Sequence, residues 1–90
     1  MPQAIVDPEE LRRFARNLQK FNNEVQDRMT LLAGQLIGLG TTWRDQENKK
    51  FVEQFEQQIK AITGFVEATN QHIPYLLRKA EHIDQYLQQG

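Results

Sequence analysis

The chain has 90 residues, a formal net charge of −1 and no cysteine. That length suits one small domain, and the near-neutral charge argues against a chain that binds nucleic acid through its overall charge. Without cysteine, disulfides and thiolate metal sites are excluded. No apolar run approaches the roughly 20 residues that a membrane-spanning helix needs.

The N-terminal segment is expected to be a loose lead-in over residues 1–6. It lacks the basic region and the long apolar region of a cleaved signal peptide. We therefore expect a cytoplasmic protein, with export by a route that needs no cleaved signal peptide left open.

A first helix is predicted over about 7–39. Asp7 can cap it, Pro8 suits the first helical position and Glu10 suits the third. Apolar residues then recur at alternating steps of three and four, as one buried stripe on a helix requires. They are Leu11, Phe14, Leu18, Phe21, Val25, Met29, Leu32, Leu36 and Leu39.

Two glycines lie one turn apart near the end of this helix, at Gly34 and Gly38. Each weakens a helix interior by about 1 kcal/mol relative to alanine. Two interpretations are open: the small residues allow a partner helix to approach closely, or they mark fraying into the turn or a small gap under Trp43.

The turn is predicted over about 40–44. Gly40 can adopt the left-handed conformation that ends a helix, and Thr42 and Asp45 have the spacing of a capping box. Trp43 lies inside this corner, as the only tryptophan of the chain. Its ring can cap the end of a helical bundle or serve as a binding anchor.

A second helix is predicted over about 45–88, with a kink near Pro74, which removes a backbone donor and crowds the carbonyl of Asn70. Its stripe comprises Phe51, Phe55, Ile59, Ile62, Val66, Thr69, Ile73, Leu77, Ala80, Ile83 and Leu87.

The predicted fold is all-α: residues 1–90 form one antiparallel two-helix hairpin. Such a hairpin buries little apolar surface against itself, so we expect two hairpins to associate into a four-helix bundle. The residues expected to form the hairpin core or the dimer core are Leu11, Phe14, Leu18, Phe21, Val25, Leu32, Leu36, Phe51, Phe55, Ile62, Val66, Ile73, Leu77 and Ile83.

The residue types that commonly catalyse reactions or bind metals do not occur at the spacings that such sites need. His72 and His82 are ten positions apart, not the four of a helical zinc pair. We predict no catalytic residue, no metal and no cofactor. The basic clusters, such as Arg12-Arg13 and Lys49-Lys50, have acidic neighbours and suit a solvated surface better than a nucleic-acid interface.

The order of a long helix, a turn that contains Trp43 and a second long helix resembles the WXG family of early-secreted-antigen-like proteins over the whole chain. Phe51 falls where that family often has an aromatic residue. The sequence departs from the family at Trp43-Arg44-Asp45, which replaces Trp-x-Gly. It also lacks the C-terminal Tyr-x-x-x-acid export signal, since Lys79 stands four residues after Tyr75 and Gly90 four residues after Tyr86.

The resemblance implies a non-enzymatic protein-interaction module that pairs with itself as a homodimer or with a paralogous hairpin. It further implies a substrate, chaperone or adaptor of type VII secretion, which contacts the secretion machinery or an effector protein. Trp43, Arg44 and Asp45 define the turn that such a partner would contact. The alternative hypothesis is a cytoplasmic adaptor bundle within a larger assembly, not exported.

Overall fold

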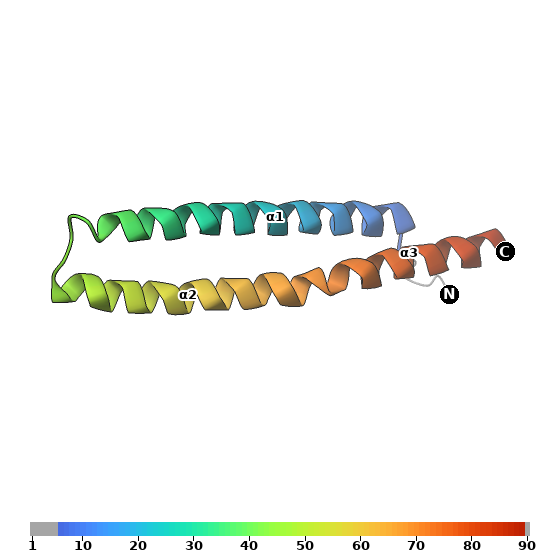
Figure 1. The fold of residues 1–90 in the computed structure, drawn as a ribbon. Coiled ribbons are helices and arrows are strands. Elements are labelled where there is room, and N and C mark those ends of the chain that lie inside the picture. Colours follow the sequence, from blue (N-terminus) through green and yellow to red (C-terminus); the bar gives the residue numbers. More distant parts are fainter. Residues whose placement is uncertain (1–5, 90) are drawn as a thin grey trace.

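The computed structural model describes residues 6–89 and has three helices in that range: α1 (Pro8–Leu39), α2 (Gln46–Asn70) and α3 (His72–Gln89). α1 runs antiparallel to a rod made of α2 followed by α3 (Figure 1). The molecule is elongated, with extents of 68 × 21 × 16 Å. The predicted all-α hairpin is confirmed. Residues 1–5, where most of the lead-in was expected, lie outside the described residues.

The start of α1 follows from its first residues. Asp7 is the N-cap, and its carboxylate accepts a hydrogen bond of 2.9 Å from the Glu9 backbone N–H. Pro8 occupies the first turn together with Glu9 and Glu10, whose charges favour the positive end of the helix dipole. The predicted cap and the proline position are confirmed.

At the end of α1, the backbone conformation of Gly40 differs from the prediction. Its φ of −63° is right-handed, and no glycine has a positive φ among residues 6–89. The backbone N–H groups of Gly40, Thr41 and Thr42 instead donate to carbonyls three residues earlier, each at 3.1 Å. The predicted left-handed Gly40 is therefore wrong, because tightening of the last turn satisfies these carbonyls without a positive φ.

α2 begins at Gln46, directly after its N-cap Asp45. The Asp45 carboxylate accepts a hydrogen bond of 3.1 Å from the Asn48 N–H, as an N-cap does. The Thr42 hydroxyl instead donates to the Leu39 carbonyl at 3.4 Å. The predicted capping box with Thr42 as the cap is therefore wrong, since Thr42 belongs to the end of α1.

The second arm of the hairpin is interrupted at Gln71, three residues before Pro74. Pro74 cannot donate a backbone hydrogen bond and its ring crowds the preceding turn, so the helical ladder breaks upstream of it. Gln71 N–H donates to the Ala68 carbonyl at 3.3 Å. The chain then continues in nearly the same direction as α3 (Figure 1).

Among residues 6–88, whose side chains the structure describes, fully buried side chains occur in only one half of the molecule. Ala15, Asn22, Val66 and Ala80 are buried, and all lie where α1 meets α3 and the end of α2. We call residues 8–22 and 66–89 the closed half, and residues 23–65 the turn half. Alanine at the contact lets two helix axes approach closely, so Ala15 and Ala80 account for the tight packing of the closed half.

Candidate protein interaction surface

The predicted core residues separate into two sets. One set is buried or half-buried between the arms: Leu11, Leu18, Val25, Leu36, Phe55, Val66, Ile73 and Ile83. The other set is exposed: Phe14, Phe21, Leu32, Phe51, Ile62 and Leu77. The predicted single stripe on each arm is thus two parallel stripes, and the hairpin itself covers only one of them.

Most of the exposed residues share one geometric property: each immediately precedes a residue that faces the other arm. On α1, Phe14 precedes Ala15 and Phe21 precedes Asn22. On α2, Phe65 precedes Val66. On either helix, the residue one position before an inward-facing residue is rotated by the same angle around the helix axis. In an antiparallel pair, this rotation places the side chains of both helices on the same side of the hairpin.

These side chains therefore form one surface, which we call the aromatic face. It comprises Phe14, Phe21, Leu32, Leu39, Phe51, Ile62 and Phe65. Phe14 is 58% exposed, Phe21 51% and Phe65 52%. Leu77 follows the inward-facing Leu76 instead, so it points to the opposite side. An exposed apolar row along two helices is the kind of surface that marks a protein interface.

The predicted turn motif connects to this face. The half-buried Trp43 ring lies 5.7 Å, centroid to centroid, from the ring of Phe51, and Phe51 lies 5.6 Å from Phe55. Arg44 Nε donates to the Thr41 carbonyl at 3.1 Å, and Asp45 caps α2. Arg44 and Asp45 thus hold the turn, while Trp43 extends the aromatic row to the end of the hairpin.

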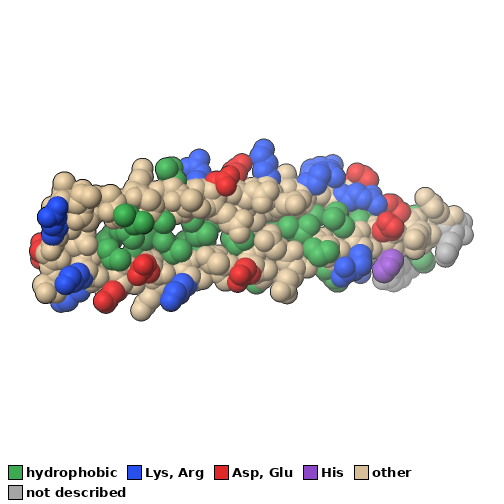
Figure 2. Space-filling model, viewed as in Figure 1, with side chains coloured by type: hydrophobic (Ala, Val, Ile, Leu, Met, Phe, Trp, Pro, Cys, Tyr) green, Lys and Arg blue, Asp and Glu red, His purple; other side chains and the backbone are tan. Residues whose placement is uncertain are grey.

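A groove lies between α1 and α2 in the turn half. It has a volume of about 570 Å³, and hydrophobic side chains are visible in the hollow between the two helices (Figure 2). Its lining residues are Ala33, Leu36, Ile37, Gly40, Asn48, Val52, Glu56, Ile59 and Lys60. Ile37 and Lys60 follow the inward-facing Leu36 and Ile59, so the groove opens on the side away from the aromatic face.

The two glycines of α1 make no close crossing within the hairpin. A Cβ atom added at Gly34 or at Gly38 would meet no other atom within 4 Å. If Gly34 and Gly38 allow a helix to approach closely, as one interpretation of the sequence holds, that helix is therefore neither α2 nor α3.

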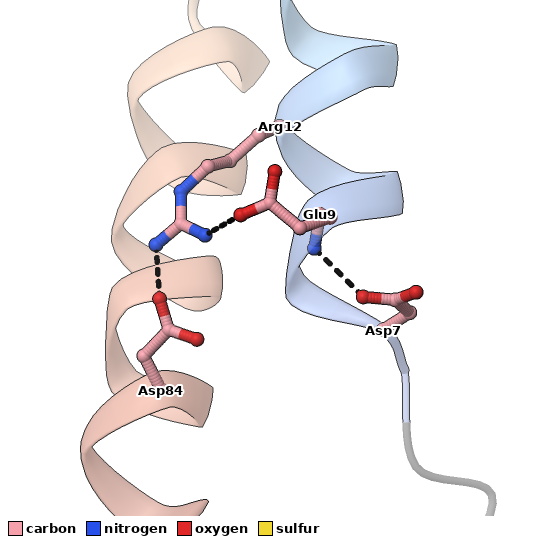
Figure 3. Close-up of polar contacts among 4 residues, drawn as sticks. All are labelled: Asp7, Glu9, Arg12 and Asp84. Atoms are coloured by element: carbon pink, nitrogen blue, oxygen red, sulfur yellow. Dashed lines mark hydrogen bonds and ion pairs between the residues drawn. The ribbon is translucent and has the colours of Figure 1, made fainter.

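Polar contacts join α1 to the second arm at two levels of the closed half. Arg12 donates to the carboxylates of Glu9, at 2.7 Å, and of Asp84 on α3 (Figure 3). The hydrogen bond to Asp84 raises the pKa of the Arg12 guanidinium, opposed by desolvation and supported by Glu9.

The second polar contact involves Asn22, which sequence reasoning missed. Asn22 is 1% exposed, and its Nδ2 donates to Thr69 Oγ1 at 3.0 Å and to Asn70 Oδ1 at 2.8 Å. A signal was present in the sequence, because Asn22 continues the inward row of Leu18 and Val25 at steps of four and three. The predicted stripe passes from Phe21 to Val25 and leaves Asn22 out.

Within residues 6–89, no group of three or more His, Cys, Asp or Glu side chains is placed to hold a metal ion. His72 and His82 are both exposed. In the same range, each helix is too short or too polar to cross a membrane.

Comparison with known proteins identifies one family. The model of the WXG100 family, described as proteins of 100 residues with WXG, matches residues 3–86. No curated protein and no solved structure matches the chain. The family is associated with type VII secretion and protein–protein interaction, and its members are helical and non-enzymatic. With a match over nearly its whole length and the helical hairpin expected of that family, this chain belongs to the WXG100 family.

Proposed function

We propose that this protein is a non-enzymatic interaction module whose aromatic face packs against a second hairpin, giving an antiparallel four-helix bundle. The second hairpin is another copy of the chain or a paralogue. The observation that supports this most is the division of apolar residues, with a few small side chains buried and a row of phenylalanines exposed. Burying a Phe or Leu side chain contributes roughly 1.5–3 kcal/mol, so pairing adds apolar burial that one hairpin lacks.

The proposed role in the cell is that of a type VII secretion substrate, chaperone or adaptor, made in the cytoplasm and exported by the type VII route. Family membership supports this role. Trp43, Arg44 and Asp45 form the end of the bundle that the secretion machinery or an effector protein would contact. Trp43 is the proposed anchor, because part of its ring stays accessible beside Phe51.

A second candidate function is a cytoplasmic adaptor in a larger assembly, without export. It is favoured by the residue at the position of the motif glycine, since Asp45 stands there and caps α2. It is also favoured by Lys79, four residues after Tyr75, where the family signal has an acid. Detection of the intact chain in culture medium without cell lysis supports export, and strict retention in cells supports the adaptor.

Pairing is tested by the solution mass of the purified chain, measured by light scattering at several micromolar concentrations, with helical content followed in parallel. We expect twice the mass of one chain. Phe21→Glu combined with Phe65→Glu puts two charges on the aromatic face and should reduce the mass to that of one chain, with loss of helix.

The matched control is Leu31→Glu, which changes a residue that is also exposed, at 62%. Leu31 lies two positions before the half-buried Ala33, and helix geometry therefore places it on the outer side of α1. It should leave the dimer intact. A well-folded monomer of the unmodified chain would contradict the proposal. A poorly folded monomer would favour a paralogous hairpin over a second copy.

A further inference from the structure

The side-chain hydrogen bonds between α1 and α2 come from one residue. Among residues 6–89, Asn22 alone makes them, to Thr69 and Asn70 at the last turn of α2. Asn22 is buried, whereas Asn70 is exposed and Thr69 half-buried. A directional contact thus lies in the middle of a row of apolar side chains.

The apolar row by itself defines the register of the two arms poorly. The inward row of α1 includes Leu18, Val25 and Met29, and that of the second arm includes Ile59, Val66 and Ile73. All six side chains are aliphatic or thioether. Apolar contact is non-directional, so sliding one arm by a turn exchanges similar contacts. A single buried asparagine in a helical interface penalises such slides, because its amide loses its partners.

We propose that Asn22 is a positioning residue that fixes the register of α1 against α2 through Thr69 and Asn70. The register decides which phenylalanine of α1 lies beside which aromatic residue of α2, and therefore the pattern of the aromatic face. Only this consequence for pairing depends on the proposed function. The register itself is a property of one hairpin.

The surroundings of Asn22 separate this role from a merely structural one. Without Asn22, the Asn70 side chain remains accessible to water, and the Thr69 hydroxyl still donates to the Phe65 and Val66 carbonyls at 2.8 and 3.2 Å. Asn22→Leu therefore leaves no buried partner unsatisfied and adds apolar contact. It should keep or raise the thermal stability of the hairpin while removing what defines its register.

The test uses the absence of cysteine from the chain. Arg16→Cys and Lys49→Cys, at exposed positions on α1 and α2 near opposite ends of the hairpin, carry a pair of spin labels, so that the distance between them runs mainly along the hairpin axis. The labelled chain is diluted with unlabelled protein so that only distances within one chain are measured. In the otherwise unmodified chain we expect one distance. In Asn22→Leu we expect two or more, separated by roughly 5 Å for each turn of slide.

The matched control is Asn23→Leu, the same change at the exposed neighbouring position, which should keep a single distance. If Asn22→Leu does not fold, Thr69→Val combined with Asn70→Ala removes the two acceptors and should give the same splitting. A single unchanged distance in the folded variant overturns the proposal. Loss of helix in both variants also overturns it, since Asn22 would then support folding rather than register.

The outcome is distinguishable from the fate of the proposed function. The distances are measured within one chain, whereas pairing is measured by mass. A monomeric protein whose register splits in Asn22→Leu keeps this inference and loses the pairing proposal. A dimer that keeps one register in every variant supports the pairing proposal and overturns this inference.

Discussion

The closed half and the turn half of the hairpin contain similar numbers of apolar side chains but pack differently. In the closed half, Ala15 and Ala80 allow α1 and α3 to approach, and Val66 becomes fully buried. In the turn half, Leu36, Val52 and Ile59 line an open groove instead. The comparison teaches that the size of the side chains between the two arms, more than the number of apolar residues, decides where this hairpin closes.

The largest expected effect breaks the closed half. Ala80→Asp places a carboxylate at a fully buried position without a partner, and we predict a loss of more than about 3 kcal/mol in the free energy of unfolding. Leu31→Asp, at a position 62% exposed in the turn half, should change it by less than about 0.5 kcal/mol. Chemical denaturation at one fixed protein concentration measures both. Equal losses would mean that the two halves are equally packed.

A gentler pair of truncations compares the halves directly. Val66→Ala removes two carbons from a buried site and should cost about 2 kcal/mol. Ile59→Ala removes three carbons but lines the groove, so it should cost less than Val66→Ala. The reverse order in denaturant midpoints would show that the groove is closed in solution.

The two helix caps sharpen the comparison, because their hydrogen bonds are alike at 2.9 Å for Asp7 and 3.1 Å for Asp45. Replacing either by alanine should cost about 1 kcal/mol if the helix it caps unfolds with the whole chain. We predict a smaller thermal shift for Asp45→Ala, since the start of α2 lies at the open end and frays locally. A larger shift for Asp45→Ala than for Asp7→Ala would contradict this difference.

The smallest effect concerns the ion pair between Arg12 and Asp84 across the closed half. Asp84→Asn removes the charge from a partly exposed pair, so the melting temperature should fall by less than in the cap variants, and the difference should vanish at high salt. The hydrogen bond to Asp84 raises the pKa of Arg12. Because the pKa is raised, the charged guanidinium stabilises the fold at pH values below the unfolded-state pKa, and this contribution is lost only at strongly alkaline pH. Changes of pH near neutrality should therefore not alter the stability of the fold through Arg12.

Much of the fold could be predicted because it depends on local patterns. Periodic apolar residues, the Asp7-Pro8 start and the corner at Trp43 together indicate two antiparallel helices. The details that failed depend on competing hydrogen bonds. Gly40 is able to be left-handed but does not need to be, and the Thr42 hydroxyl bonds backward to Leu39 rather than forward.

The candidate interface was harder to derive for a physical reason. A helical stripe that includes Phe14, Leu18 and Phe21 is wide enough to serve two contacts, and periodicity does not say which members face the other arm. Packing decides it: Leu18 turns inward while Phe14 and Phe21 stay exposed. Which partner covers the exposed residues, and the roles of Trp43, Arg44 and Asp45 in binding, remain predictions.

Amide hydrogen exchange along the intact chain is the most direct measurement of the difference between the halves. We predict the slowest exchange in α3 and in the part of α1 around Ala15, with faster exchange in the first turns of α2 and the last turns of α1 beside the groove. Uniform protection along both arms, or slower exchange at the turn than in α3, would contradict a hairpin that is closed at one end and open at the other.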